Sequence, residues 1–148
     1  MNAMDKIIDV LLIEDNSTET SLINKILDHD KWGVNFNRVG DGMEAMDYLY
    51  KKGKYKNSKT PSLILLDLDL PKKNGHKVLK EIKTDEVLKC VPVIVLTNSN
   101  DDKDISESYE NHANAYIIKP IDFDKFKRDI QCFKEFWFNN VQLPIREY

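Results

Sequence analysis

Several short apolar runs of the chain end in side chains that can do chemistry. The runs IIDVLLI, LILL, VPVIVL and AYII are followed by Glu14 and Asp15, by Asp67, by Thr97 and by Lys119, respectively. Carboxylates held close together repel one another unless a hard cation lies between them, and Mg²⁺ prefers such oxygen ligands together with water and phosphate oxygens. An ammonium group and a hydroxyl suit an incoming phosphoryl group. The set therefore indicates a carboxylate that accepts a phosphoryl group.

The stretch LILLDLDLP, residues 63–71, carries the candidate reactive group. Its Leu/Ile run predicts a strand buried on both faces of a sheet, and Asp67 closes that run. In open α/β sheets, ligands bind at the carboxyl ends of the strands. A carboxylate is costly there unless a cation or hydrogen bonds hold it, and it needs no separate general base because it is already ionised. We therefore expect Asp67 to be the phosphoryl acceptor and not merely a turn residue that ends a strand.

Apolar periodicity predicts five strands that alternate with five helices. The strands are expected at residues 7–13, 34–39, 63–67, 91–97 and 115–119. The helices are expected at residues 17–28, from Asp41-Gly42 through Tyr50, from Asn74 or Gly75 through Ile82, and at residues 98–112 and 122–138. The repeated alternation predicts an α/β fold, a three-layer sandwich whose five-stranded parallel sheet carries helices on both faces and right-handed crossovers.

Spacing along two of these helices predicts which side chains face the sheet. The second helix is expected to turn these residues inward: Met43, Met46, Leu49 and Tyr50. The fourth helix is acidic and only weakly amphipathic, with Ile105 and Tyr109 as its main anchors. Residues 51–62, KKGKYKNSKTPS, have no periodicity, so we expect a long solvated loop. A docking patch for a kinase or a nucleic acid is the alternative reading of its lysines.

Length, charge and cysteine usage restrict the class of protein. The chain has 148 residues, a net charge of −3 and two cysteines. This length suits one domain that buries a full core, and the negative charge argues against a general nucleic-acid binder. Cys90 and Cys132 have no CxxC spacing and are expected to be reduced and structural. The apolar stretch Ile7–Ile13 is interrupted by Asp9 and is too short to span a membrane, so we expect a cytoplasmic protein.

The sequence resembles the receiver domains of bacterial two-component response regulators over nearly its whole length. The resemblance is carried by Glu14-Asp15 after the first strand, Asp67 with a following Leu-Pro and a later Gly75, Thr97 after VIVL, and Lys119-Pro120. The LPKKNG turn, the basic loop and an aromatic helix with a Leu-Pro tail narrow it to stand-alone regulators paired with bacterial and cyanobacterial phytochrome histidine kinases. The resemblance implies a flavodoxin-like fold with strand order 2-1-3-4-5. It also implies a receiver domain over residues 1–139 and a tail over residues 140–148.

The resemblance implies a phosphoryl-transfer chemistry with a metal ion. Asp67 would take the phosphoryl group from the phosphohistidine of a sensor histidine kinase. Asp15, Asp67 and the backbone carbonyl of Asp69 would ligate Mg²⁺, with Glu14 nearby and acting largely through water. Glu14 stands where the family more often has aspartate, and its longer side chain changes its reach to the metal. The protein would not be an enzyme, because its only chemistry is self-phosphorylation and self-dephosphorylation.

Other positions acquire roles from the same resemblance. Thr97 and Lys119 would bind the phosphoryl oxygens, and Tyr116 would be the aromatic residue that changes rotamer on activation. The Lys119–Pro120 peptide bond is expected to be cis, as in the family, although X-Pro bonds are cis in only about 5–6% of cases generally. Asn98 replaces a residue that is usually smaller, so it is expected to crowd the path to Asp67.

Two other function classes fit part of the pattern. A haloacid dehalogenase-type phosphatase would use Asp67 and Asp69 as a DxD pair, but that pair normally ends the first strand of a larger domain, whereas here it follows the third. A flavodoxin-like electron carrier would bind flavin phosphate after the first strand. The loop there reads Glu-Asp-Asn-Ser, which is acidic where a phosphate needs backbone and hydroxyl donors.

The last helix carries more aromatic residues than one packing stripe requires. Residues at steps of three and four form that stripe, namely Phe123, Phe126, Ile130, Phe133 and Trp137, while Phe136 and Phe138 lie off it. Apolar groups beyond what a core can cover mark an interface. We therefore expect a symmetric homodimer built from this helix and the tail. The alternative is that the tail folds back over its own domain and covers them.

Overall fold

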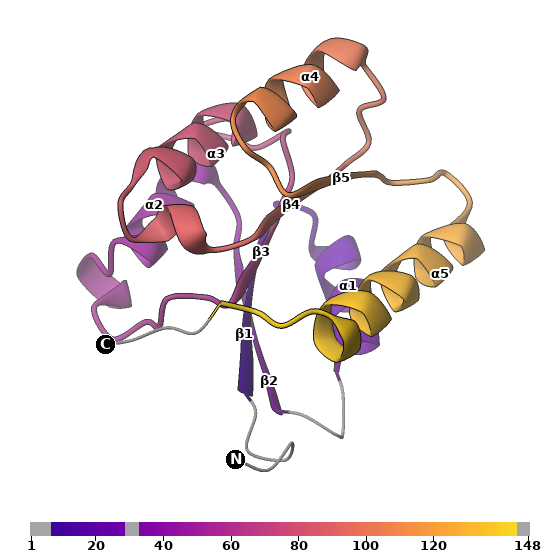
Figure 1. Ribbon diagram of the computed structural model, residues 1–148, viewed down its shortest axis with the longest axis horizontal. Helices are drawn as coiled ribbons and strands as arrows, with labels where there is room; N and C mark the ends of the chain where they lie inside the picture. Colours follow the sequence, from indigo (N-terminus) through magenta and orange to yellow (C-terminus); the bar gives the residue numbers. More distant parts are fainter. Residues whose placement is uncertain (1–6, 29–32, 145–148) are drawn as a thin grey trace.

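The computed structural model describes residues 7–28 and 33–144. Its five strands form one parallel sheet in the order β2-β1-β3-β4-β5 (Figure 1). The strands are β1 (Ile7–Ile13), β2 (Gly33–Val39), β3 (Leu63–Leu66), β4 (Val93–Thr97) and β5 (Ala115–Ile118). This order and the parallel pairing of every neighbouring strand confirm the expected flavodoxin-like sheet.

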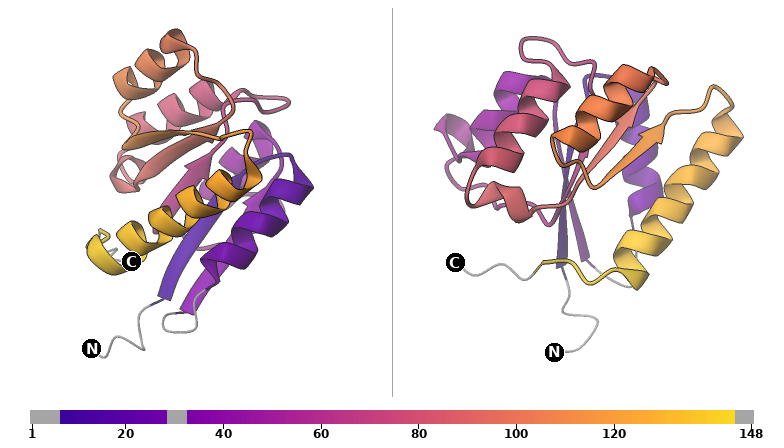
Figure 2. Two further views of the ribbon diagram at one scale, coloured as in Figure 1. Left: turned by 90° about the vertical axis from the view of Figure 1, so that its right-hand side faces the viewer. Right: turned by 45° about the horizontal axis from the view of Figure 1, so that its top comes forward.

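Helices alternate with the strands and cover both faces of the sheet. They are α1 (Ser17–Leu27), α2 (Gly42–Leu49), α3 (Gly75–Thr84), α4 (Asp102–Glu110) and α5 (Phe123–Lys134). Figure 1 and Figure 2 show α1 and α5 on one face and α2, α3 and α4 on the other. The predicted three-layer sandwich is therefore confirmed.

Two apolar cores lie on either side of the sheet, and the strand residues alternate between them. Ile64 and Leu66 of β3 point into the first core, which α2 and α3 cover. Leu63 and Leu65 point into the second core, which α1 and α5 cover. All four side chains are fully buried, which is why β3 reads as an unbroken apolar run. The first polar residue after this run is Asp67, at the edge where the strands end.

An aspartate or asparagine caps the N-terminus of each α-helix. The caps are Asn16, Asp41, Asn74, Asp101 and Asp122, and each side chain accepts a hydrogen bond from a backbone N–H two or three residues later. Such caps satisfy N–H groups that have no partner within the helix. The caps start the helices soon after the strands end, so the first turns of the helices surround the carboxyl edge of the sheet, which is the edge at which all five strands end.

The inward face of α2 differs from the one expected. Met46 and Leu49 are buried as predicted, but Met43 and Tyr50 are exposed. The face that packs on the sheet instead begins at Gly42 and continues three, four and seven positions later, at Ala45, Met46 and Leu49. Gly42 determines this rotation because its backbone lies against that of Lys73, where a side chain would not fit.

One of the two anchors predicted for α4, Tyr109, was also wrong. Tyr109 is exposed, and the residue that α4 buries completely is Ser108. Ile105, the other predicted anchor, is partly buried, and Ser108 lies three positions after it. The hydroxyl of Ser108 donates a 2.8 Å hydrogen bond to the carbonyl of Asp104, which satisfies a polar group inside an otherwise apolar contact.

The end of the last helix departs from regular α-helical geometry. After Lys134 the chain forms a π-helical turn over Glu135–Asn140. A π-turn brings residues five apart onto one face, and this places Phe138 next to Phe133 in the second core. Phe138 is 1% exposed. The sequence spacing had placed it off the packing stripe, and that interpretation was wrong.

The tail folds back over the second core. Leu143 is buried there, and Val141 packs against it while partly exposed. The buried residues Phe126, Phe133 and Phe138 therefore cannot contribute to an interface, which corrects half of the expected set. Phe123 and Phe136 remain exposed, and Trp137 is partly buried. Ile145 lies outside the described residues.

Two further expectations can be compared with the described chain. Cys90 and Cys132 are free, as expected, but both are exposed, so neither packs in a core. In residues 7–28 and 33–144, no helix combines the length and the hydropathy needed to cross a lipid bilayer. The loop of residues 51–62 contains one short 3₁₀ turn, Gly53–Tyr55, and its lysines at 51, 52, 54, 56 and 59 are exposed.

Candidate functional site

Backbone hydrogen bonds place the predicted site residues side by side at the carboxyl edge. The N–H of Asp67 donates to the carbonyl of Ile13 at 3.0 Å, and the N–H of Lys119 donates to the carbonyl of Thr97 at 2.7 Å. The site residues Glu14, Asp67, Thr97 and Lys119 are all buried. The convergence expected from the strand ends is therefore present.

The ammonium of Lys119 is the centre of the polar contacts. Its Nζ lies 2.8 Å from Glu14 Oε2 and 3.2 Å from Asp67 Oδ2. It also lies 2.6 Å from Oε2 of Glu19, on the first turn of α1. The sequence did not indicate Glu19, because an acidic residue in the first turn of a helix is explained by the helix dipole alone. One cation thus holds three carboxylates together.

The crowding of these charges changes the affinity of the groups for protons. Burial, together with the hydrogen bond and the charge of Asp67, raises the pKa of Glu14 to about 8, although Lys119 acts in the opposite direction. Burial would lower the pKa of Lys119, but its hydrogen bonds to Glu14 and Glu19 raise it above the ordinary lysine value. A lysine with this pKa stays charged at neutral pH.

Carboxylate oxygens of Glu14, Asp15 and Asp67 lie within 4.8 Å of one another. All are hard oxygen donors, and the carboxylates of Glu14 and Asp67 are buried. This donor set fits a divalent cation of the Mg²⁺ or Mn²⁺ type. The N–H of Asp69 donates to Asp67 Oδ1 at 3.1 Å, so the backbone of Asp69 is beside the set, as its predicted role requires.

Thr97 and Tyr116 lie along the next strands. Thr97 is buried at the end of β4, and its Oγ1 lies 3.5 Å from the backbone N of Ser99. The hydroxyl of Tyr116 donates to the carbonyl of Ser99 at 2.9 Å, so its ring lies against the loop that follows Thr97. Burial raises the pKa of Tyr116, so it remains a hydrogen-bond donor at neutral pH.

Residues 10–131 match the family described as the response regulator receiver domain. The chain belongs to this family. One of its relatives is response regulator Rcp1 of Synechocystis sp. The two sequences are 40% identical over 135 residues, which cover 91% of this chain and 92% of Rcp1. The probable methanogenesis regulatory protein FilR2 of Methanothrix harundinacea is 39% identical over 137 residues, which cover 91% of this chain and 86% of FilR2. Neither the phosphatase nor the flavodoxin family is the one that the chain matches.

Solved structures of receiver domains have the same fold as this one. The Mn²⁺-bound form of response regulator Rcp1 superimposes with a TM-score of 0.90 at 39% identity, covering 93% of this chain and 99% of that one. The phosphorylated cyanobacterial phytochrome response regulator RcpA has a TM-score of 0.90 at 42% identity over the same shares of the two chains. The resemblance to phytochrome response regulators, which the sequence indicated, is confirmed.

A groove of about 500 Å³ leads from the surface of this receiver domain to Thr97. Its lining includes Asp69, His76, Asn98, Ser99 and Asp104. Asn98 is exposed and lines this groove, and its expected crowding of the path to Asp67 stays a prediction. A hydrogen-bonded chain closes the far wall: Ser99 Oγ donates to Asp104 Oδ2 at 2.6 Å, and His76 Nε2 bonds Asp104 Oδ1 at 2.9 Å.

No peptide bond in the described residues is cis, so the Lys119–Pro120 bond of this receiver domain is trans. The prediction of a cis bond was wrong. The end of β5 already directs the side chain of Lys119 toward the site. Its backbone N–H donates to the carbonyl of Thr97, and its Nζ contacts Asp67. The lower-energy trans isomer therefore suffices.

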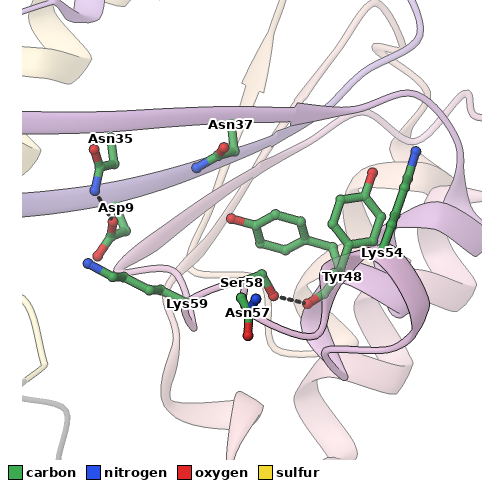
Figure 3. Close-up of a pocket in the computed structure, with 9 residues that line it drawn as sticks. Asp9, Asn35, Asn37, Tyr48, Lys54, Asn57, Ser58 and Lys59 are labelled. Atoms are coloured by element: carbon green, nitrogen blue, oxygen red, sulfur yellow. Dashed lines mark hydrogen bonds between the residues drawn. The ribbon is translucent and has the colours of Figure 1, made fainter.

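A second cavity, of about 390 Å³, lies between β1, β2 and the loop after α2 (Figure 3). Asp9 accepts a 2.9 Å hydrogen bond from Asn35 there, and Ser58 Oγ donates to the carbonyl of Tyr48 at 2.9 Å. Lys59 of the lysine-rich loop lines its wall. None of the site residues at the carboxyl edge belongs to this cavity.

Proposed function

We propose that this receiver domain accepts a phosphoryl group on Asp67 from the phosphohistidine of a sensor histidine kinase. The convergence of Asp67, Thr97 and Lys119 at the carboxyl edge is the observation that carries the proposal. The transfer forms a bond between a carboxylate oxygen of Asp67 and phosphorus. It breaks the phosphorus–nitrogen bond of the donor, and the imidazole leaves with the electron pair and takes a proton from water.

The residues around Asp67 orient the acceptor and bind the transferred group. The N–H of Asp69 and the ammonium of Lys119 each contact one oxygen of the Asp67 carboxylate, at 3.1 and 3.2 Å. These contacts fix its plane before transfer. After transfer, Lys119 and the hydroxyl of Thr97 bind the phosphoryl oxygens as fixed donors.

Asp15, Asp67 and the backbone carbonyl of Asp69 would hold Mg²⁺, with Glu14 beside them, directly or through water. When bound, Mg²⁺ supplies positive charge that offsets the charge of the phosphoryl group. The proposal is supported by the all-oxygen donor set and by the Mn²⁺-bound form of the relative Rcp1. In this site Glu14, Asp15 and Asp67 keep their carboxylates close together, and Lys119 neutralises part of their charge.

The kinase partner is proposed to be of the phytochrome type, because RcpA, at 42% identity, is a cyanobacterial phytochrome response regulator. A groove of about 350 Å³ beside Lys119 offers a place for it, with Leu22 and Phe123 among its lining residues. Ile121 lies at the same place and is fully exposed. An exposed apolar rim next to a buried polar site suits a partner that must bring its phosphohistidine close to Asp67.

The output of this domain is proposed to be protein contact, without turnover of a separate substrate and within the cytoplasm. One such contact is a homodimer. Phe136 and Ile118 are exposed beside Trp137, and these residues line a groove of about 660 Å³ along β5 and α5. Since β5 is an edge strand, a second copy is free to approach this face.

Phosphorylation is tested by labelling with acetyl phosphate and Mg²⁺. The wild type should gain one hydroxylamine-labile phosphate, and Asp67→Asn should gain none. Asp47→Asn is the matched control because Asp47 is exposed on α2, and it should label like the wild type. Undiminished labelling of Asp67→Asn would exclude Asp67 as the acceptor.

The dimer is tested by analytical ultracentrifugation at micromolar concentration. The wild type should sediment as a dimer and Phe136→Glu as a monomer, whereas Tyr109→Glu, an exposed position on α4, should remain dimeric. A monomeric wild type, both unphosphorylated and with beryllofluoride bound, would contradict the proposal.

A further inference from the structure

The ammonium of Lys119 has no hydrogen left to offer. A lysine ammonium carries three N–H donors. Here they face Glu14 Oε2 at 2.8 Å, Glu19 Oε2 at 2.6 Å and Asp67 Oδ2 at 3.2 Å. If Lys119 is to bind a phosphoryl oxygen on Asp67, one of the present acceptors has to give up its place.

Glu19 differs from the other two acceptors in position and in surroundings. Its side chain is 28% exposed, whereas those of Glu14 and Asp67 are almost completely buried. Within the described residues, the group of carboxylates that could hold a cation consists of Glu14, Asp15 and Asp67 and does not include Glu19. Among the described residues, the ion pair of the Glu19 carboxylate is the one with Lys119.

The cost of release also distinguishes Glu19. A carboxylate that stays buried after it loses its cation is strongly destabilising. A carboxylate at the protein surface exchanges its partner for water at little cost. Glu14 would stay buried without its cation, and Asp67 stays beside the ammonium because it carries the phosphoryl group, so the contact to Glu19 is the one that an incoming phosphoryl group can displace most easily.

We propose that Glu19 is a latch that occupies the ammonium of Lys119 until the phosphoryl group on Asp67 displaces it. The latch rests on the proposed function of Asp67. Glu19 is a positioning residue, since it acts on the reacting group through Lys119. It slows phosphorylation because it withholds one of the three N–H donors of Lys119 from the incoming phosphoryl group.

The latch also connects the site to a surface. Glu19 and Lys119 both line the 350 Å³ groove that contains Leu22 and Phe123. When Lys119 turns to the phosphoryl group, the carboxylate of Glu19 is left facing this groove without its cation. Phosphorylation therefore changes the charge at the surface on which we place the kinase.

The test compares initial rates of labelling by acetyl phosphate at saturating Mg²⁺. Glu19→Gln keeps the shape of the side chain and removes its charge, so it should label roughly three- to tenfold faster than the wild type. Glu86→Gln makes the same charge change at a side chain that is 88% exposed and pairs only with Lys89, and its rate should stay within about twofold of wild type. Equal rates for Glu19→Gln and the wild type would overturn the latch.

A double-variant cycle shows whether Glu19 acts through the lysine. In a Lys119→Met background, Glu19→Gln should no longer accelerate labelling, because the contact that it relieves is gone. The same acceleration in that background would overturn the latch. If Lys119→Met fails to fold or to label, the single variants decide the question.

The same experiment separates the latch from the proposed function. Asp67→Asn is labelled in parallel. A wild type that gains no phosphate, or an Asp67→Asn variant that gains as much, would overturn the proposed function and the latch with it. Labelling that depends on Asp67 but not on Glu19 would overturn the latch alone.

Discussion

Replacing Phe138 with alanine should cost far more stability than replacing Phe136, although the two residues are only two positions apart. Phe138 is 1% exposed and Phe136 is 52% exposed. The ring of Phe138 meets that of Phe133 edge to face at 6.4 Å between centroids. Truncating a buried phenylalanine costs about 3–5 kcal/mol, whereas an exposed substitution away from special features stays within about 0.5 kcal/mol. The difference comes from the π-turn, which puts the core position five residues after Phe133.

Thermal unfolding, followed by circular dichroism, measures both costs. At about 2–4 °C per kcal/mol for a chain of this size, the melting temperature of Phe138→Ala should fall by roughly 6–20 °C. Phe138→Leu, which keeps most of the volume, should lose much less. If the last turn were a regular α-helix, Phe136 and Trp137 would face the core instead. A larger loss for Phe136→Ala than for Phe138→Ala would refute the π-turn reasoning.

Two more predictions concern a glycine and a tyrosine. Gly75→Ala should destabilise the protein by about 1–3 kcal/mol and lower labelling of Asp67, because a Cβ there would press on the carbonyl oxygen of Asp67 and the backbone of Leu68. Gly33→Ala, where the nearest atom lies at an ordinary 3.5 Å, is the control, and equal losses in melting temperature would contradict the prediction. Tyr50 is exposed, but partial desolvation of its hydroxyl and the 2.8 Å hydrogen bond to Glu81 raise its pKa to about 12, so the folded protein keeps a proton that the unfolded chain begins to lose near pH 10. Its stability should therefore decline between about pH 10 and 12, and urea midpoints of Tyr50→Phe that decline equally over this range would contradict the assignment.

The strands and the site at their ends could be predicted from the sequence because both follow from local rules. β3 is an unbroken run of Leu and Ile, and such a run has few alternatives to a buried strand when a charged residue ends it. In a parallel sheet all such ends share one edge, so Asp67, Thr97 and Lys119 had to converge once the strands were assigned. No knowledge of side-chain packing was needed.

Other features depend on how the elements pack, and local sequence does not encode them. Glu19 is an ordinary first-turn residue of α1 in the sequence. It becomes a partner of Lys119, 100 positions away, only because α1 packs beside α5 and directs its first turn toward the end of β5. The π-turn is hidden for a similar reason: the spacing of aromatic residues after Phe133 fits an α-helix equally well, and the tail through Leu143 decides which ring is covered. The outward position of Met43 follows from the contact between Gly42 and Lys73, which no periodicity reveals.

Polar and charged side chains that are buried, against the usual preference for burying apolar ones, also indicate where the function lies. In the described residues, the buried polar or charged side chains are Asp9, Glu14, Ser62, Asp67, Thr97, Ser108 and Lys119. Four of these seven gather at the carboxyl edge, where burial is the main cause that raises the pKa of Glu14 to about 8. Stability alone would favour apolar residues in these positions. The cluster of buried carboxylates around Lys119 is instead what suits the site to the proposed function, because a cation and a phosphoryl group would each change the contacts of Lys119.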